Sequence, residues 1–166
     1  MARKVSDKLT KEGKRIFTEL AKLSGLQVKV GFTAEGGGHG VGGESVSAEG
    51  YDNNATVAQV ATWNEFGTTN IPARPFMRQS VDNHTSEIAK MCDIMTEKVV
   101  TGEVDADKAL RAIGALQVGL IQNEIREGDF EENAPSTVKQ KGSSAPLINT
   151  GNMLQSVHYV VSNKEG

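Results

Sequence analysis

The sequence predicts an α+β fold in which amphipathic helices pack on a small sheet and a long glycine-rich insertion, a loop or a hairpin, interrupts the chain. Apolar residues recur at helical spacing in four segments, over residues 6–24, 55–66, 75–101 and 106–127. In two short segments, 26–32 and 157–162, apolar and polar residues alternate, which is typical of half-buried strands. Because the chain has 166 residues and no internal repeat, we expect a single domain.

The first helix is expected over residues 6–24, with Ser6 as its N-cap and Gly25 at its end. Its apolar stripe consists of Leu9, Ile16, Leu20 and Leu23. Residues 1–30 carry eight Lys or Arg against three Asp or Glu. This basic character indicates either a solvated helix face or a contact with an acidic partner or with DNA, and the sequence leaves both interpretations open.

The strand over 26–32 leads into a glycine-rich insertion over 34–54, which holds seven of the 18 glycines. Gly38, Gly40 and Gly43 have dinucleotide-loop spacing, but no helix is expected to open at the third glycine, as a pyrophosphate site requires. Because it has few apolar residues and no apolar stripe, the insertion cannot offset its ordering entropy alone. We therefore expect no bound cofactor. We expect the insertion to be flexible, and either to pair with the sheet edge of a neighbouring protein or to have no role.

Three further helices follow. Asn53 or Asn54 is expected to cap the helix over 55–66, and Gly67 to end it. Pro72 and Pro75 exclude helix up to residue 74, so that Pro75 becomes the first residue of a helix over 75–101. Asp105 is expected to cap the helix over 106–127. Inside that helix, Gly114 and Gly119 indicate the close approach of another backbone, because glycine costs about 1 kcal/mol there relative to alanine.

The remainder is expected to be a polar loop over 129–146, a helical turn capped by Asn149 or Thr150, and the strand over 157–162. The three histidines lack metal-ligand spacing. Cys92 has no histidine within hydrogen-bonding reach on its own helix, since His84 lies about 12 Å away along the axis. We therefore expect neither a metal site nor an enzyme. No stretch is long and apolar enough to cross a membrane, and the basic N-terminus lacks the apolar core of a signal peptide.

Two motifs are distinctive. The first runs from Trp63-Asn64-Glu65-Phe66-Gly67 to Ile71-Pro72-Ala73-Arg74-Pro75-Phe76-Met77-Arg78. The second, about 75 residues later, runs from Pro146-Leu147-Ile148-Asn149-Thr150-Gly151 to Met153-Leu154-Gln155-Ser156-Val157. Together they resemble the N-E-F-G-x-x-x-I-P-A-R-P-F-[LM]-R and P-L-[IV]-[DN]-T-G-x-[LM]-x-x-S-[IV] signatures of the tail-completion and neck proteins of tailed bacteriophages. The glycine-rich insertion is not part of this pattern.

The resemblance implies a small structural virion protein, assembled in the host cytoplasm, that completes the tail at the head–tail junction. It implies a homo-oligomeric ring, six-fold as in the tail tube, whose partners are head-closure, tail-terminator and tail-tube proteins. It also implies an interaction role for ten motif residues: Glu65, Phe66, Gly67, Pro72, Arg74, Pro75, Phe76, Arg78, Thr150 and Gly151. The tail-terminator and head-closure functions remain alternatives. A nucleic-acid-binding adaptor that uses the basic N-terminal helix is an alternative of another class, although direct DNA contact is not expected.

The segment around Pro75 has two interpretations that the sequence does not separate. In the first, Arg74 and Phe76 flank a turn stiffened by proline and dock on a neighbouring protein, where arginine offers five donors and phenylalanine an apolar anchor. In the second, the segment is internal, with Phe76 in the core and Arg74 bonded to helix ends of its own chain. The burial of these two side chains distinguishes the interpretations.

Overall fold

The computed structural model describes residues 9–32, 55–135, 138–139, 144–148 and 151–164. In these residues the chain has the predicted α+β fold, a set of helices packed on a two-stranded antiparallel sheet. The segment 34–54, expected to be a flexible insertion, lies outside the described residues.

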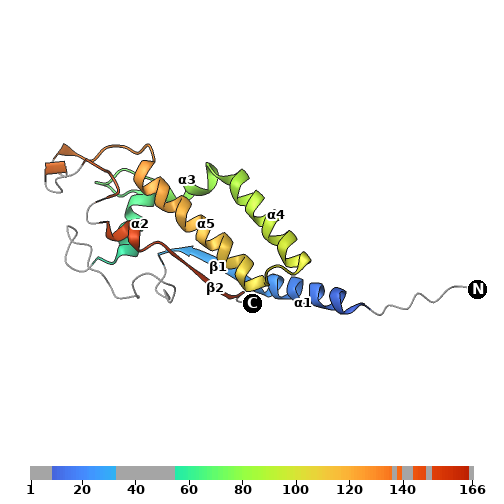
Figure 1. The fold of residues 1–166 in the computed structure, drawn as a ribbon. Helices are drawn as coiled ribbons and strands as arrows, with labels where there is room; N and C mark the ends of the chain where they lie inside the picture. The colour runs from blue at the N-terminus through green and yellow to red at the C-terminus, as the bar shows by residue number, and fades with distance from the viewer. Residues whose placement is uncertain (1–8, 33–54, 136–137, 140–143, 149–150, 165–166) are drawn as a thin grey trace, which may run out of the picture.

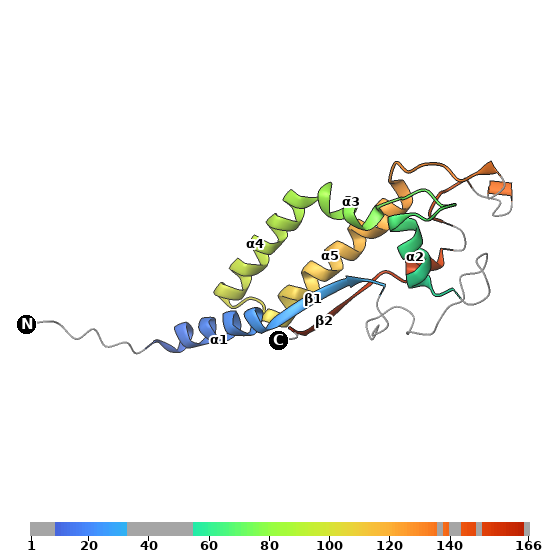
Figure 2. The same cartoon turned by 180° about the vertical axis from the view of Figure 1, so that it is seen from behind.

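The long helix α5 (Ala106–Glu127) is the centre of the fold. Helices α3 (Phe76–Asp82) and α4 (Thr85–Thr101) pack along one side of it, and the sheet packs along another. Figure 1 shows α5 running between α4 and the two strands, with α1 (Lys11–Gly25) near one end of the molecule and α2 (Val57–Phe66) near the other. The reverse view in Figure 2 shows the same order.

The sheet joins β1 (Leu26–Gly31) to β2 (His158–Asn163). Leu26 lies opposite Asn163, and Gly31 lies opposite His158. Because paired residues project from the same face, this register places the alternating apolar residues of both strands together. They are Val28, Val30, Tyr159 and Val161.

One of the two glycines inside α5 allows the close approach that was expected. A Cβ atom on Gly114 would lie 2.7 Å from Cγ of Tyr159 and 2.9 Å from Cγ2 of Val28. The close contact is therefore with side chains of the sheet, not with another backbone. At Gly119, no atom beyond the adjacent residues and the backbone of its own helix lies within 4 Å of the corresponding position, so the expectation of close packing is wrong there.

Helix α1 buries none of its residues completely, and two of its charged side chains bond to neighbouring helices. Arg15 donates from Nη1 to the carbonyl oxygen of Val99 at 3.2 Å and from Nη2 to that of Val100 at 2.8 Å. One turn later, the Glu19 carboxylate accepts the backbone N–H of Ala106 at 2.9 Å. A cation thus lies at the C-terminus of α4 and an anion at the N-terminus of α5, as the helix dipoles favour.

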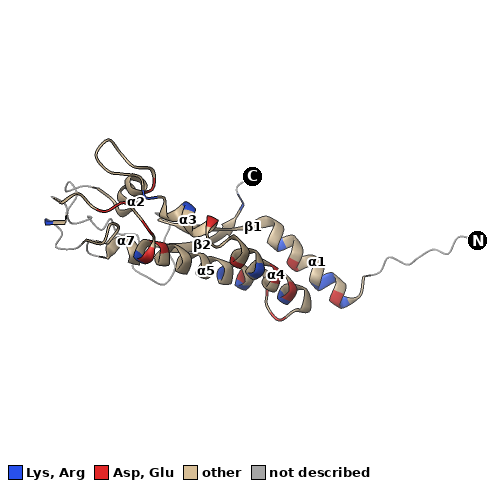
Figure 3. Cartoon of the chain, turned by 90° about the horizontal axis from the view of Figure 1, so that it is seen from above, with Lys and Arg blue, Asp and Glu red and all other residues tan. Residues whose placement is uncertain are grey.

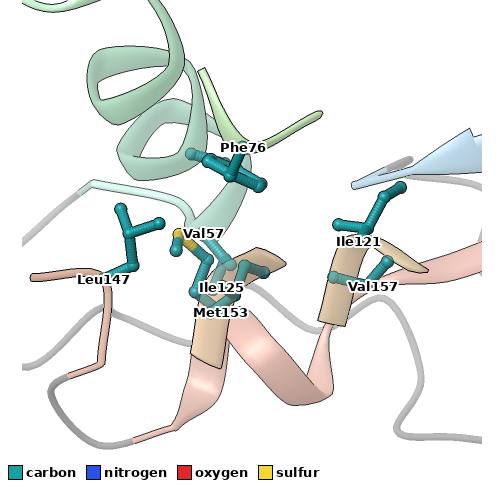
Figure 4. Close-up of a cluster of buried hydrophobic side chains, with 8 residues drawn as sticks. Val57, Phe76, Ile121, Ile125, Leu147, Met153 and Val157 are labelled. Carbon is teal, nitrogen blue, oxygen red and sulfur yellow. The ribbon is translucent and has the colours of Figure 1, made fainter. Parts of the chain in front are cut away.

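The main core lies between α5, α2 and the segment before β2. Its buried members are Val57, Ala61, Phe76, Ile121, Ile125, Leu147, Met153 and Val157. Figure 4 shows these side chains gathered from parts of the chain that are distant in sequence. The ring of Phe76 is completely buried and meets Phe32 edge to face, with 6.1 Å between the ring centroids.

The predicted helix over 75–101 is wrong in one respect, because it consists of two helices separated at Asn83 and His84. The Asn83 side chain donates to Oε1 of Glu124 at 2.9 Å. Asparagine is a poor helix former, and this contact with α5 holds it at the break. Pro75 is the N-cap of α3 and not its first helical residue.

Other boundaries differ by a few residues. Thr10 caps α1 by accepting the N–H of Gly13, whereas Ser6 lies outside the described residues. Thr56 caps α2, in a reciprocal pair of bonds with Gln59, in place of Asn53 or Asn54. The 129–146 segment is not entirely a loop, since the Val138 N–H donates to the Ala134 carbonyl oxygen at 3.0 Å in a helical turn. The bounds of α5 and its Asp105 cap are as predicted.

Candidate interaction site

The first motif begins where α2 ends and folds back onto that end. Gly67 has a φ of 76°, and a Cβ atom there would lie 3.0 Å from the backbone nitrogen of Ala73. The backbone N–H of Thr68 donates to the carbonyl oxygen of Ile71 at 2.8 Å. The backbone N–H of Arg74 donates to the carbonyl oxygen of Asn64 at 2.6 Å. Glycine is favoured at position 67 because the chain there adopts a positive φ and closely approaches its own backbone.

Glu65 connects α2 to the first turn of α3. Its buried carboxylate accepts the backbone N–H groups of Met77 at 2.9 Å and Arg78 at 3.3 Å. The Arg78 side chain donates to the same carboxylate from Nε at 3.2 Å. Pro75 provides no side-chain hydrogen bond at this helix start, and the carboxylate of Glu65 satisfies the free N–H groups in its place.

Arg74 is buried, with 3% of its surface exposed. It donates from Nε to the carbonyl oxygen of Glu131 at 2.9 Å and from Nη2 to that of Glu132 at 3.3 Å. Two side-chain oxygens also accept from this guanidinium, Oδ1 of Asn64 at 3.3 Å and Oδ1 of Asn133 at 3.2 Å. The guanidinium therefore ties the segment after α5 to the end of α2.

These contacts agree with the internal interpretation of the Pro75 segment. Phe76 is a core residue, and the donors of Arg74 bond to the chain's own carbonyl and amide oxygens. The structure thus places both side chains away from the surface that a neighbouring protein would contact. Pro72 and Pro75 are half-buried beside them.

Among the described motif residues that were expected to make contacts, Phe66 and Arg78 are exposed. Phe66 is 69% exposed, and the guanidinium carbon of Arg78 lies 5.6 Å from the centroid of its ring. This distance is typical of a cation–π contact. Arg78 is itself mostly exposed, although its Nε is bonded to Glu65. The pair is an aromatic and cationic patch, and Tyr, Trp, Phe and Arg are enriched at protein interfaces.

The second motif packs against the first. Leu147, Met153 and Val157 belong to the same core cluster as Phe76. Gly151 has a φ of 81° and precedes the short helix α7 (Asn152–Gln155) as its N-cap. Thr150, the other residue singled out in this motif, lies outside the described residues.

Sequence reasoning missed Asn64 and Asn133 as partners of Arg74. Asn64 is buried and also donates from Nδ2 to the Val60 carbonyl oxygen at 2.8 Å. A polar residue on the otherwise apolar face of α2 is the one signal that could have indicated its role. Asn133 has no comparable signal, because it lies in a polar segment whose sequence resembles an ordinary loop.

A pocket of about 510 Å³ lies where α3 meets the end of α5. Its lining includes Asn83, His84, Glu124, Glu127 and Asp129. The carboxylate of Glu124 is already bonded to Asn83, and Nε2 of His84 lies 3.8 Å away from it. Among the residues that the structure describes, no group of three or more His, Cys, Asp or Glu side chains is arranged to hold a metal ion.

No protein-family model, curated protein or solved structure matches this chain. None of the helices in the described part of the chain has both the length and the apolar character needed to span a membrane.

Proposed function

We propose that this chain is a structural virion protein of a tailed bacteriophage, which completes the tail at the head–tail junction. The observation that carries the proposal is the meeting of the two motifs. Although about 75 residues separate them in sequence, Phe76 of the first and Leu147, Met153 and Val157 of the second share one core cluster. Motifs that pack together in this way form one structural unit, as expected of a signature that specifies a fold.

The exposed part of that unit is the proposed contact with the neighbouring neck or tail protein. Phe66 supplies an apolar ring, and Arg78 supplies a cation held beside it. Because Glu65 already fixes the Arg78 side chain, less of its side-chain entropy is lost on docking. Glu65, Gly67, Arg74, Pro75 and Phe76 support this surface from inside the fold.

The proposal includes a homo-oligomeric ring, six-fold to match a tail tube, with head-closure, tail-terminator and tail-tube proteins as neighbours. Within this class, tail completion is preferred to the terminator and head-closure functions on the resemblance of the motifs. The proposal assigns the protein no catalytic role and requires no direct contact with DNA.

The test uses a phage genome that encodes this chain, with its gene deleted and supplied from a plasmid. We expect the deletion to leave filled heads and separate tails, and cryo-electron microscopy of complemented virions to place the protein at the junction. Normal virions from the deletion, or virions that lack the protein, would reject the proposal.

Two variants test the patch itself. Phe66→Ser and Arg78→Ala are expected to lower the yield of joined particles, because each removes half of the exposed contact. Arg126→Ala is the matched control, since Arg126 is an exposed arginine on α5 outside the patch. Circular dichroism of each purified variant separates loss of assembly from loss of folding.

A further inference from the structure

Helix α1 exposes an apolar stripe that the described chain covers only in part. Leu9, just before the helix, is 50% exposed, Phe17 is 60% exposed and Leu20 is 38% exposed. Positions 9, 13, 17 and 20 share one helical face. Amphipathic helices normally turn such a stripe toward a core, but α1 has no fully buried residue. Ile16 and Leu23 are half-buried on its other side, and Arg15 and Glu19 bond to the neighbouring helices.

The charge around this stripe indicates the kind of partner. Residues 1–25 carry seven Lys or Arg against three Asp or Glu, whereas residues 26–166 carry eleven against eighteen. The first segment therefore has a formal charge of +4 and the remainder −7, which together give the chain's −3. Lys11 and Lys14 are exposed on α1 itself. Like charge opposes the pairing of two α1 helices, and opposite charge favours the contact of α1 with another part of a second copy.

The outer face of α4 has the complementary character. Ile94 and Val100 are exposed apolar residues there. Asp93 and Glu97 are exposed beside them, and positions 93, 97 and 100 share one face by helical spacing. Figure 3 shows basic and acidic positions on both helices. Lys90 is also exposed, one turn before Ile94, so the α4 face carries two acidic residues and one basic residue. Each face therefore combines exposed apolar side chains with a net charge opposite to that of the other.

We infer that the outer face of α1 (Leu9, Lys14, Phe17 and Leu20) docks on the outer face of α4 (Asp93, Ile94, Glu97 and Val100) of a second copy of this chain. The two faces are different surfaces of one molecule, so each copy donates one and receives the other. Such head-to-tail contacts repeat and produce a ring or a filament. The inference rests on the proposed function, because it names the contacts that would build its ring.

The first measurement is the mass of the purified protein in solution, by sedimentation over increasing concentration. We expect association beyond a dimer, weakened by salt because part of the attraction is between exposed charges. Phe17→Ser on α1 and Ile94→Lys on α4 are each expected to abolish association. Val81→Ser is the matched control, since Val81 is an exposed apolar residue on α3 and belongs to neither face.

Mixing the two defective variants gives the decisive result. The Phe17 variant keeps an intact α4 face, and the Ile94 variant keeps an intact α1 face. An equal mixture should therefore form a one-to-one heterodimer and nothing larger. A mixture that stays monomeric, or a wild-type protein that stops at a dimer or stays monomeric even at millimolar concentration, overturns the inference.

A DNA-binding assay tests the alternative that the basic face of α1 binds DNA and not a second copy of the chain. We expect the wild-type protein to cause no mobility shift of double-stranded DNA. We expect Lys14→Glu to weaken self-association. A DNA shift that Lys14→Glu removes, with self-association unchanged, would assign the face to DNA and overturn the inference. These solution results are independent of the location in the virion. A protein that associates head to tail but is absent from the junction would reject the proposed function alone.

Discussion

Gly114 on α5 lies directly against the ring of Tyr159 on β2, so closely that a single added carbon would fall 2.7 Å from Cγ of that ring. The absence of a side chain at this position is what lets the central helix lie flat on the sheet. Val28 of the other strand borders the same position at 2.9 Å. The helix–sheet spacing thus depends on one glycine.

Gly114→Ala is expected to destabilise the protein by about 1–3 kcal/mol, since overpacking moves neighbours out of their preferred positions. Gly119→Ala is the matched control on the same helix, where the added methyl group meets no atom within 4 Å. The control should stabilise the protein by up to about 1 kcal/mol, because alanine is the better helix former. Urea unfolding measures both, and equal effects would contradict the packing.

Arg74→Ala is expected to lower the free energy of unfolding by about 2–4 kcal/mol, because it leaves carbonyl and amide oxygens without their donor. Arg74→Lys should recover only part of this loss, since an ammonium group cannot reproduce the planar guanidinium geometry. Thermal or urea unfolding of the purified variants measures the change. Normal stability of the variant combined with failed virion assembly would contradict the internal interpretation and indicate that Arg74 docks on a neighbouring protein.

Glu65→Gln is expected to cost about 1–2 kcal/mol of stability, because hydrogen bonds to a charged acceptor are stronger than those to a neutral one. The loss should be accompanied by faster amide exchange at Met77 and Arg78, whose N–H groups bond to Glu65. Glu127→Gln is a suitable control, since Glu127 is exposed near the end of α5. Similar exchange in both variants would argue against the Glu65 contact.

Acid should loosen the attachment of α1. The hydrogen bond from Lys22 and that from the Ala106 N–H lower the pKa of Glu19 below its ordinary 4.5. A carboxylate with a lowered folded pKa contributes stability above its unfolded pKa and loses that stability as pH falls through the folded one. We therefore expect stability to decline as pH falls below about 4.5, and Glu19→Gln to reduce this decline. Urea unfolding across the acid range measures both slopes, and identical slopes would contradict the contact.

Parts of this fold follow directly from local sequence. Asp105 and Gly128 bracket α5 at the predicted residues, because a capping side chain and a terminal glycine are local signals. The break at Asn83 was not predictable in the same way, since the apolar spacing from Val81 to Ile88 continues a helical pattern across it. At the break, Asn83 bonds to Glu124, 41 positions away in sequence, and no local pattern indicates that contact.

The candidate site was predictable as a motif but not as a geometry. The sequence identified Arg74 and Phe76 and left open whether they face inward or outward. The answer depends on the Glu131 carbonyl oxygen, 57 positions from Arg74, and on Asn133, neither of which has a distinguishing pattern. Glu65, next to Phe66, and Phe76, two residues before Arg78, point into the fold and are buried. Phe66 and Arg78 therefore lie on the surface.

The pairing of β1 with β2 has a consequence for synthesis. Gln27 and Asn163, which bond across the sheet, are 136 positions apart. A nascent chain on the ribosome therefore holds β1 without its hydrogen-bonding partner while most of the domain is being made. From the synthesis of α5 until that of β2, the face of α5 around Gly114 is also incompletely covered, since Tyr159 is one of the residues beside it. Translation of β2 is thus the event that allows the described sheet to form, and chains released before it lack the pairing of β1 with β2.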